Sequence, residues 1–182
     1  MKYLQTYESH AVDFKRTPPP PGVTNDSSKW DEYEFDIDSV KYCVSFFTLG
    51  NKSILSFSTQ DDKGEWNNRN LTKSNPFTTM NTITQIVKKF VENHPNVDKI
   101  EFFGIKEGDT KVPDWLLKLI SSSRFISSLA VYLDIITTPP NWMSKPTRRT
   151  NMFTRWADKE VKSINWSAKR IGNQVQLIRN KN

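Results

Sequence analysis

Residues 74–105 limit the possible folds more than any other part of the sequence. Asn75-Pro76 is typical of a helix start, because asparagine caps free backbone amides and proline fits the first helical position. Apolar residues then recur at helical spacing as far as His94: Ile83, Ile86, Val87, Phe90 and Val91. A strand rich in buried-type residues follows at 98–105. A strand–helix–strand unit of this length predicts that the last strand runs parallel to an earlier one.

Two further regions carry hairpin patterns. Tyr33 to Phe46 alternates apolar and polar residues, and Gly50-Asn51 separates it from a second short apolar run at 54–57. Residues 166–178 repeat this arrangement around Gly172-Asn173. A Gly-Asn pair between two such runs is a strong hairpin signal. Helical spacing also appears at 147–164, through Met152, Phe153, Trp156 and Ile164. We therefore predict an α+β fold with a mixed, mainly antiparallel sheet and two to four helices.

The chain of 182 residues is long enough for one domain with its own core. Residues 1–30 are predicted to form an extended proline-rich arm that docks on a partner, because Pro18, Pro19, Pro20 and Pro21 favour a stiff polyproline II stretch. Residues 31–182 are predicted to form a single α+β domain with a basic C-terminal region. Within it, 60–72 and 137–146 read as loops, and 113–136 fits either a helix or a strand.

Composition excludes several classes. No apolar run approaches the ~20 residues of a membrane helix, and the first residues lack the apolar segment of a secretory signal. Cys43 is the only cysteine, which excludes an intramolecular disulfide and points to a reducing compartment. Because it lies among strand-forming residues, Cys43 is expected to be a packed small side chain.

Catalytic patterns are missing from the sequence. Its only histidines, His10 and His94, have no cysteine, histidine or carboxylate at metal-ligand spacing. There is no nucleophile elbow, phosphate-binding loop or dinucleotide motif. The sequence therefore favours a non-enzymatic protein, and we predict no catalytic residue, no metal and no cofactor.

Charge is distributed unevenly along the chain. The net charge is +6, and residues 145–182 hold ten basic and two acidic residues. The candidate residues for binding nucleic acid or a protein partner are Trp142, Arg148, Arg149, Arg155, Lys159, Lys162, Lys169 and Arg170. Lysine and arginine grip phosphates, and exposed aromatic side chains stack on bases. The alternative is that the charges only solvate a helix whose Phe153 and Trp156 are core residues.

An acidic stretch precedes the first hairpin turn. Alternation places Glu32, Glu34, Asp36 and Asp38 on one face of a strand. Such a face can be simply solvated, which protects an edge strand from aggregation. It can also bind Mg²⁺, or dock on a basic surface such as that of a neighbouring copy.

Two segments resemble small uncharacterised phage proteins: NPFTTMNTITQIVKKFVENHPNVDKIEFFGIKEGD and TRRTNMFTRWADKEV. In that type, a capped amphipathic helix leads to a strand, and a later helix begins Ser/Thr-Arg and carries an aromatic residue and an arginine one turn on. Phe153 and Arg155 match those positions. The resemblance covers roughly 31–105 and 147–182, and implies a virion component or a partner of viral machinery, in the virion or the host cytoplasm.

The order of elements is also similar to the GNAT acetyltransferase fold. In that family, backbone amides of the loop that enters the central helix bind the pyrophosphate of the cofactor. The matching positions are Lys73, Ser74, Asn75 and Phe77. This chain departs from the family pattern there, because residues 71–77 contain no glycine and include a proline.

Three functions follow from these observations. The first is a non-enzymatic, phage-type accessory or structural protein that acts through protein–protein contacts in a larger viral assembly, with copies of itself among the candidate partners. The second is a GNAT-like N-acyltransferase with a degenerate cofactor loop. The third is a small nucleic-acid-binding regulator.

Overall fold

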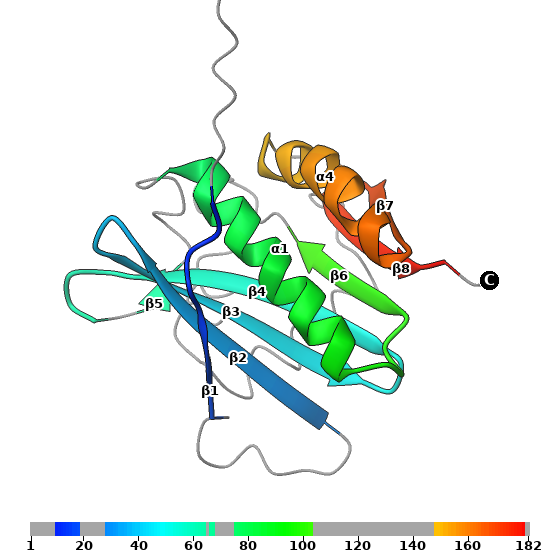
Figure 1. The fold of residues 1–182 in the computed structure, drawn as a ribbon, viewed down its shortest axis with the longest axis horizontal. Coiled ribbons are helices and arrows are strands. Elements are labelled where there is room, and N and C mark those ends of the chain that lie inside the picture. The colour runs from blue at the N-terminus through cyan, green and yellow to red at the C-terminus, as the bar shows by residue number, and fades with distance from the viewer. Residues whose placement is uncertain (1–9, 19–27, 65, 68–74, 104–147, 181–182) are drawn as a thin grey trace, which may run out of the picture.

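The computed structural model describes residues 10–18, 28–64, 66–67, 75–103 and 148–180. These residues form an α+β fold in which two α-helices lie on one face of a mixed, mostly antiparallel sheet (Figure 1). The predicted fold class is therefore confirmed. The loop predicted at 60–72 is confirmed at 61–64, but Gln60 belongs to a strand and Trp66–Asn67 form a short strand, so the prediction is wrong there. Residues 68–72, the predicted loop at 137–146, the ambiguous stretch at 113–136 and Trp142 lie outside the described residues.

Three long strands form an antiparallel meander. They are β2 (Ser28–Ile37), β3 (Val40–Leu49) and β4 (Lys52–Gln60). Gly50 in the predicted hairpin turn has a φ of 59°, which explains why glycine stands there. The turn between β2 and β3 was not predicted. It is made by Asp38 and Ser39, both with positive φ, and non-glycine residues conceal such a turn in the sequence.

Two short strands complete this half. β1 (Lys15–Thr17) pairs antiparallel with β2, and β5 (Trp66–Asn67) pairs with the end of β4. The described part of the predicted arm, residues 10–18, thus contributes a strand to the sheet.

Helix α1 (Pro76–Asn93) connects the meander to β6 (Lys99–Phe103). Strand β6 runs parallel to β4, with Ser53 opposite Ile100 and Leu55 opposite Phe102. It is the only parallel pair among the described strands. The predicted strand–helix–strand unit is therefore confirmed.

The C-terminal part supplies the rest of the sheet. Helix α4 (Arg148–Val161) runs into a 3-10 turn, η2 (Lys162–Ile164), and then into the predicted hairpin of β7 (Trp166–Ile171) and β8 (Gln174–Arg179). Strand β8 inserts between β6 and β7, so the order across the sheet is β1-β2-β3-β4-β6-β8-β7. Among the described strands, β1 is therefore at one edge of the sheet and β7 at the other.

The core lies between the sheet and the two helices. Phe90 of α1 stacks on Phe46 of β3 at a centroid distance of 3.9 Å, and Phe153 of α4 packs on Phe102 of β6 at 4.6 Å. The helices also contact each other, and Nζ of Lys88 on α1 lies 3.8 Å from Oε2 of Glu160 on α4. The described residues include no helix that is both long enough and apolar enough to cross a membrane.

Candidate functional site

The start of α1 is the position that the GNAT resemblance assigns to a cofactor. Lys73 and Ser74 lie outside the described residues, whereas Phe77 is 59% exposed. The side-chain oxygen of Asn75 accepts hydrogen bonds from the backbone amides of Phe77 and Thr78, at 3.0 and 3.4 Å. Pro76 has no amide hydrogen to donate. The first-turn donors that would face a pyrophosphate are therefore absent or already bonded.

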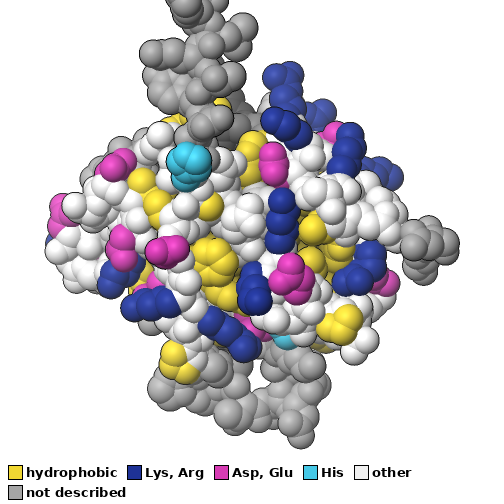
Figure 2. Space-filling model, in the orientation of Figure 1, with side chains coloured by type: hydrophobic (Ala, Val, Ile, Leu, Met, Phe, Trp, Pro, Cys, Tyr) yellow, Lys and Arg dark blue, Asp and Glu magenta, His cyan; other side chains and the backbone are white. Residues whose placement is uncertain are grey.

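The basic C-terminal residues fall into separate places. Arg155 and Lys159 lie on the exposed side of α4, and exposed Lys162 follows in η2. Lysines and arginines gather over α4 and β7 in Figure 2. Lys162 pairs with Asp158 at 3.0 Å, while the described carboxylates include no ion-pair partner of Arg155 or Lys159. These two residues form what we call the α4 basic face.

Lys169 and Arg170 are exposed but are not part of one surface. They are neighbours on β7, so their side chains point to opposite faces of the sheet. Arg170 lies on the helix side, where its guanidinium donates to Asn151 Oδ1. Arg148 and Arg149 belong to the first turn of α4. Only part of the predicted basic set is therefore brought together.

Two tryptophans that lie among these basic residues in the sequence pack toward the core. Trp166 is 2% exposed, and the guanidinium carbon of Arg179 lies 5.2 Å from its ring centre. Trp156 is partly buried against the core beside Phe153. Trp166 is therefore not available to stack on bases, and Trp156 exposes only part of its ring. The alternative in which Phe153 and Trp156 are core residues of the helix is therefore correct for Phe153 and partly correct for Trp156.

The acidic stretch is not a solvated edge. Glu32 is 4% exposed, and its Oε1 accepts a hydrogen bond from Cys43 Sγ at 3.0 Å. Glu34 lies 3.8 Å from Lys15 of β1, which leaves Asp36 and Asp38 as the exposed carboxylates of this predicted face. The interpretation as an edge-protecting face is therefore wrong for Glu32, because β1 covers the edge of β2 at this point. Burial of Cys43 is confirmed.

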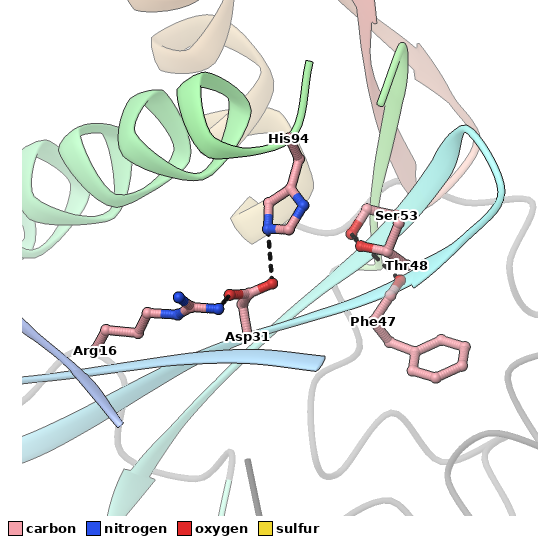
Figure 3. Close-up of polar contacts among 6 residues, drawn as sticks. All are labelled: Arg16, Asp31, Phe47, Thr48, Ser53 and His94. Atoms are coloured by element: carbon pink, nitrogen blue, oxygen red, sulfur yellow. Dashed lines mark hydrogen bonds and ion pairs between the residues drawn. The ribbon is translucent and has the colours of Figure 1, made fainter. Parts of the chain in front are cut away.

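A buried charged cluster lies at the opposite face of β2, below the end of α1. Asp31 is 2% exposed, and its carboxylate contacts the guanidinium of Arg16 on β1. His94, which ends α1, places Nε2 2.8 Å from the other carboxylate oxygen of Asp31 (Figure 3). Burying a charge is costly unless it is paired, so these three side chains hold β1, β2 and α1 together.

Sequence reasoning missed this cluster, although a signal was present. Asp31 alternates along the strand with Tyr33, Phe35 and Ile37, so its side chain points to the same face as these core residues. A carboxylate at a core position requires a cationic or hydrogen-bonding partner, and Arg16 is one such residue. A similar alternation of Val12, Phe14 and Arg16 marks the strand β1.

The burial of Asp31 also acts on Tyr33. The burial of Tyr33 raises the pKa of its hydroxyl above the ordinary value of 10, and the nearby charge of Asp31 raises it further. Its neutral form is therefore favoured in the folded protein.

Figure 3 also shows a second polar contact, in which Thr48 donates to Ser53 Oγ and Ser53 donates to the Phe47 carbonyl, each at 3.2 Å. This pair ties the ends of β3 and β4.

The part of the chain that the structure describes contains no group of three or more histidine, cysteine, aspartate or glutamate side chains placed to hold a metal. Asp31 and His94 form a pair, but Arg16 occupies the remaining carboxylate oxygen. These contacts join β1 and α1 to β2.

Comparison with protein-family models, with curated proteins and with solved structures gave no match. The proposals below therefore depend on the contacts and surfaces of this chain.

Proposed function

We propose that this protein is a non-enzymatic accessory or structural component of a larger viral assembly, and that it works through protein–protein contacts. The observation that carries the proposal is the α4 basic face. Arg155 and Lys159 are exposed on a helix whose other side, through Phe153 and Ala157, is fixed in the core. A charged surface on a rigid element favours an acidic partner, because little conformational freedom is lost on binding.

The viral setting is taken from the resemblance of the α1–β6 and α4 segments to phage proteins. On this proposal the protein acts in the virion or in the host cytoplasm, and its partners are other proteins of the assembly, including copies of itself.

Two candidates from other classes make different predictions. The order of antiparallel strands, α1, parallel β6, α4 and a final hairpin supports a GNAT-like N-acyltransferase. The proline and the occupied amides at the start of α1 argue against cofactor binding there. The α4 basic face supports a nucleic-acid-binding regulator, but Trp166 is buried and Trp156 is only partly exposed, so neither offers a fully exposed ring for stacking on bases.

The test is a pull-down from infected cells with the wild-type protein and two variants. Arg155→Glu/Lys159→Glu reverses the α4 basic face, and Lys52→Glu/Lys63→Glu reverses two exposed charges elsewhere as the matched control. We expect a viral protein to be retained by the wild type and the control, to be lost with the α4 variant, and to resist nuclease treatment.

The other candidates have their own readouts. Loss of the captured protein after nuclease, together with DNA or RNA binding at ~50 mM salt, would establish the regulator instead. A rise in melting temperature with millimolar acetyl-CoA would contradict the non-enzymatic proposal.

A further inference from the structure

Strand β7 is paired along one side only among the described strands, where it meets β8. Its turn has two residues, so the closing pair Ile171–Gln174 exchanges hydrogen bonds, and bonded pairs recur at every second position along the strand. The backbone N–H and C=O groups of Ala168 and Arg170 therefore point away from β8, and the part of the chain that the structure describes holds no partner for them. This edge is able to accept one more strand.

The β7 edge is regular and firmly held. β7 has six residues and pairs with β8 without a bulge, whereas β1 at the other edge has three. Trp166 at its start is 2% exposed, and Ala168 packs against the core from the helix side. Arg170 donates to Asn151 Oδ1 of α4, which fixes the far end of the strand. A strand that is already held in its bound conformation loses little conformational freedom when a partner adds to it.

Basic side chains lie on both sides of this edge. Arg170 points to the helix side and Lys169 to the opposite face, and both are exposed. Arg155 follows Asn151 by one turn of α4, so it lies on the flank of the helix that contacts Arg170. The carboxylate of Asp158 on the next turn is already in an ion pair with a lysine, at 3.0 Å. A strand added here therefore meets positive charge from α4 and from β7 itself.

This charge determines which kind of strand fits. A second copy of the chain would bring an edge that is basic as well, either β7 with Lys169 and Arg170 or β1 with exposed Lys15 and Arg16. Like charges on adjacent strands are destabilising, and lysine on an edge strand protects against self-pairing. An extended segment rich in aspartate and glutamate meets no such barrier, because its carboxylates approach basic side chains. The charges thus disfavour a second copy and favour an acidic strand.

We propose that the β7 edge binds an extended acidic segment of a protein partner, which adds to the sheet as a further strand. The backbone of the segment bonds to the outward groups of Ala168 and Arg170. Its side chains alternate between the two faces, so that carboxylates on one face meet Arg155 and Arg170 and those on the other meet Lys169. This inference rests on the proposed function, since it names the chemistry of the acidic partner and the strand that receives it.

The experiment is an NMR titration of the isotope-labelled full chain with an end-blocked peptide, Thr-Glu-Asp-Val-Glu-Asp-Thr, at millimolar concentration. The neutral counterpart, Thr-Gln-Asn-Val-Gln-Asn-Thr, is the control. Before peptide is added, we expect the amides of Ala168 and Arg170 to exchange with solvent faster than that of Lys169, which bonds to β8. The acidic peptide should then shift the amide signals of Ala168 and Arg170, and the neutral peptide should bind severalfold more weakly.

Two variants separate strand addition from simple charge attraction. Ala168→Pro removes one outward N–H and leaves the β7–β8 bonds in place, since proline is tolerated on an edge strand. Lys169→Glu/Arg170→Glu reverses the charge of two exposed side chains. We expect each variant to weaken binding of the acidic peptide severalfold, while Lys52→Glu/Lys63→Glu leaves it unchanged. The melting temperature of each variant checks that it is folded, and the charge variant decides the matter if Ala168→Pro does not fold.

Strand addition is overturned if the amides of Ala168 and Arg170 are as protected as that of Lys169 in the free chain, or if the acidic peptide does not shift them. It is also overturned if the neutral peptide binds equally well, or if either folded variant binds like the wild type. None of these results depends on the pull-down. Capture of a viral protein through the α4 basic face leaves the proposed function standing when strand addition fails, whereas loss of that capture with the peptide bound at β7 removes the proposed function alone.

Discussion

The two edges of the sheet, β1 and β7, are held in opposite ways. Strand β7 is anchored by Trp166, which is buried in the same core as Phe153 of the preceding helix α4. Strand β1 is joined to the domain by a charge contact from Arg16 to buried Asp31, by a three-residue ladder, and by the partly buried Val12 and Phe14 that precede it. The β7 edge is thus built from residues close in sequence and is part of the core. The β1 edge is a segment added to a domain that already has a core.

The largest expected effect tests the β7 side. Trp166→Ala removes a fully buried aromatic side chain and its contact with Arg179, so we expect the free energy of unfolding to fall by about 3–5 kcal/mol. Chemical denaturation followed by circular dichroism measures this change. Ile171→Ala on the same strand is the control, because Ile171 is 49% exposed and its loss is expected to cost less than about 1 kcal/mol. Equal losses in the two variants would show that β7 is not a core strand.

The next effect tests the β1 side. Arg16→Ala leaves Asp31 with His94 as its remaining ion partner, and we expect a loss of about 1–2 kcal/mol, since Arg16 itself is more than half exposed. The loss should be local. Amide hydrogen exchange is expected to speed up at residues 12–17 while α4 and β7 keep their protection. Lys15→Ala, which removes a surface pair, is the control; faster exchange throughout the sheet would contradict a separable β1.

A smaller effect comes from Tyr33, which faces the same edge. Its pKa is raised in the folded state, so folding is linked to keeping its proton. This contribution is complete below pH 10, the ordinary pKa, and is lost as the pH rises through the higher folded value. Wild-type stability should therefore fall more steeply above pH 10 than that of Tyr33→Phe. Denaturation midpoints at pH 8 to 11 make the comparison, and identical slopes would refute it.

The smallest effect on stability is expected at the α4 basic face. Arg155→Glu/Lys159→Glu changes exposed side chains only, so the free energy of unfolding should move by no more than about 0.5 kcal/mol. The same variant is the one expected to lose its protein partner. A stability loss as large as that of Trp166→Ala would make these residues structural, and would remove the basis for assigning them to binding.

The elements that could be predicted from the sequence are those with regular local patterns. Asn75-Pro76 and the apolar stripe up to Val91 identify α1, and Gly50 and Gly172 mark two hairpins. The turn at Asp38-Ser39 was missed, because its left-handed backbone is formed without glycine. β1 was assigned to a separate arm, because three residues give too short a pattern to show that they pair with β2.

The alternation of β2 puts Asp31 on the core face, but its two partners in the buried cluster come from distant parts of the chain. Asp31 meets a residue 15 positions before it and another 63 positions after it, and only the paired sheet brings them together. Composition near Asp31 suggested a solvated acidic strand, but parity places Asp31 in the core and Glu32 against Cys43. For the basic region, sequence spacing correctly grouped Arg155 and Lys159 on α4. The predicted hairpin at 166–178 already implied that the neighbours Lys169 and Arg170 point to opposite faces, and grouping them by charge alone overlooked this.

The parallel pair of β4 with β6 has a consequence for how the chain is made. During synthesis from the N-terminus, the β2–β4 meander is complete before α1 and β6 have been produced. Until residues 99–103 arrive, the side of β4 that will receive them is an unpaired strand edge with Ile54 and Leu55 nearby. The nascent half-sheet therefore passes through an interval in which it is open to pairing with another chain. Rapid formation of α1, whose contacts are local, shortens that interval by delivering β6 to its place.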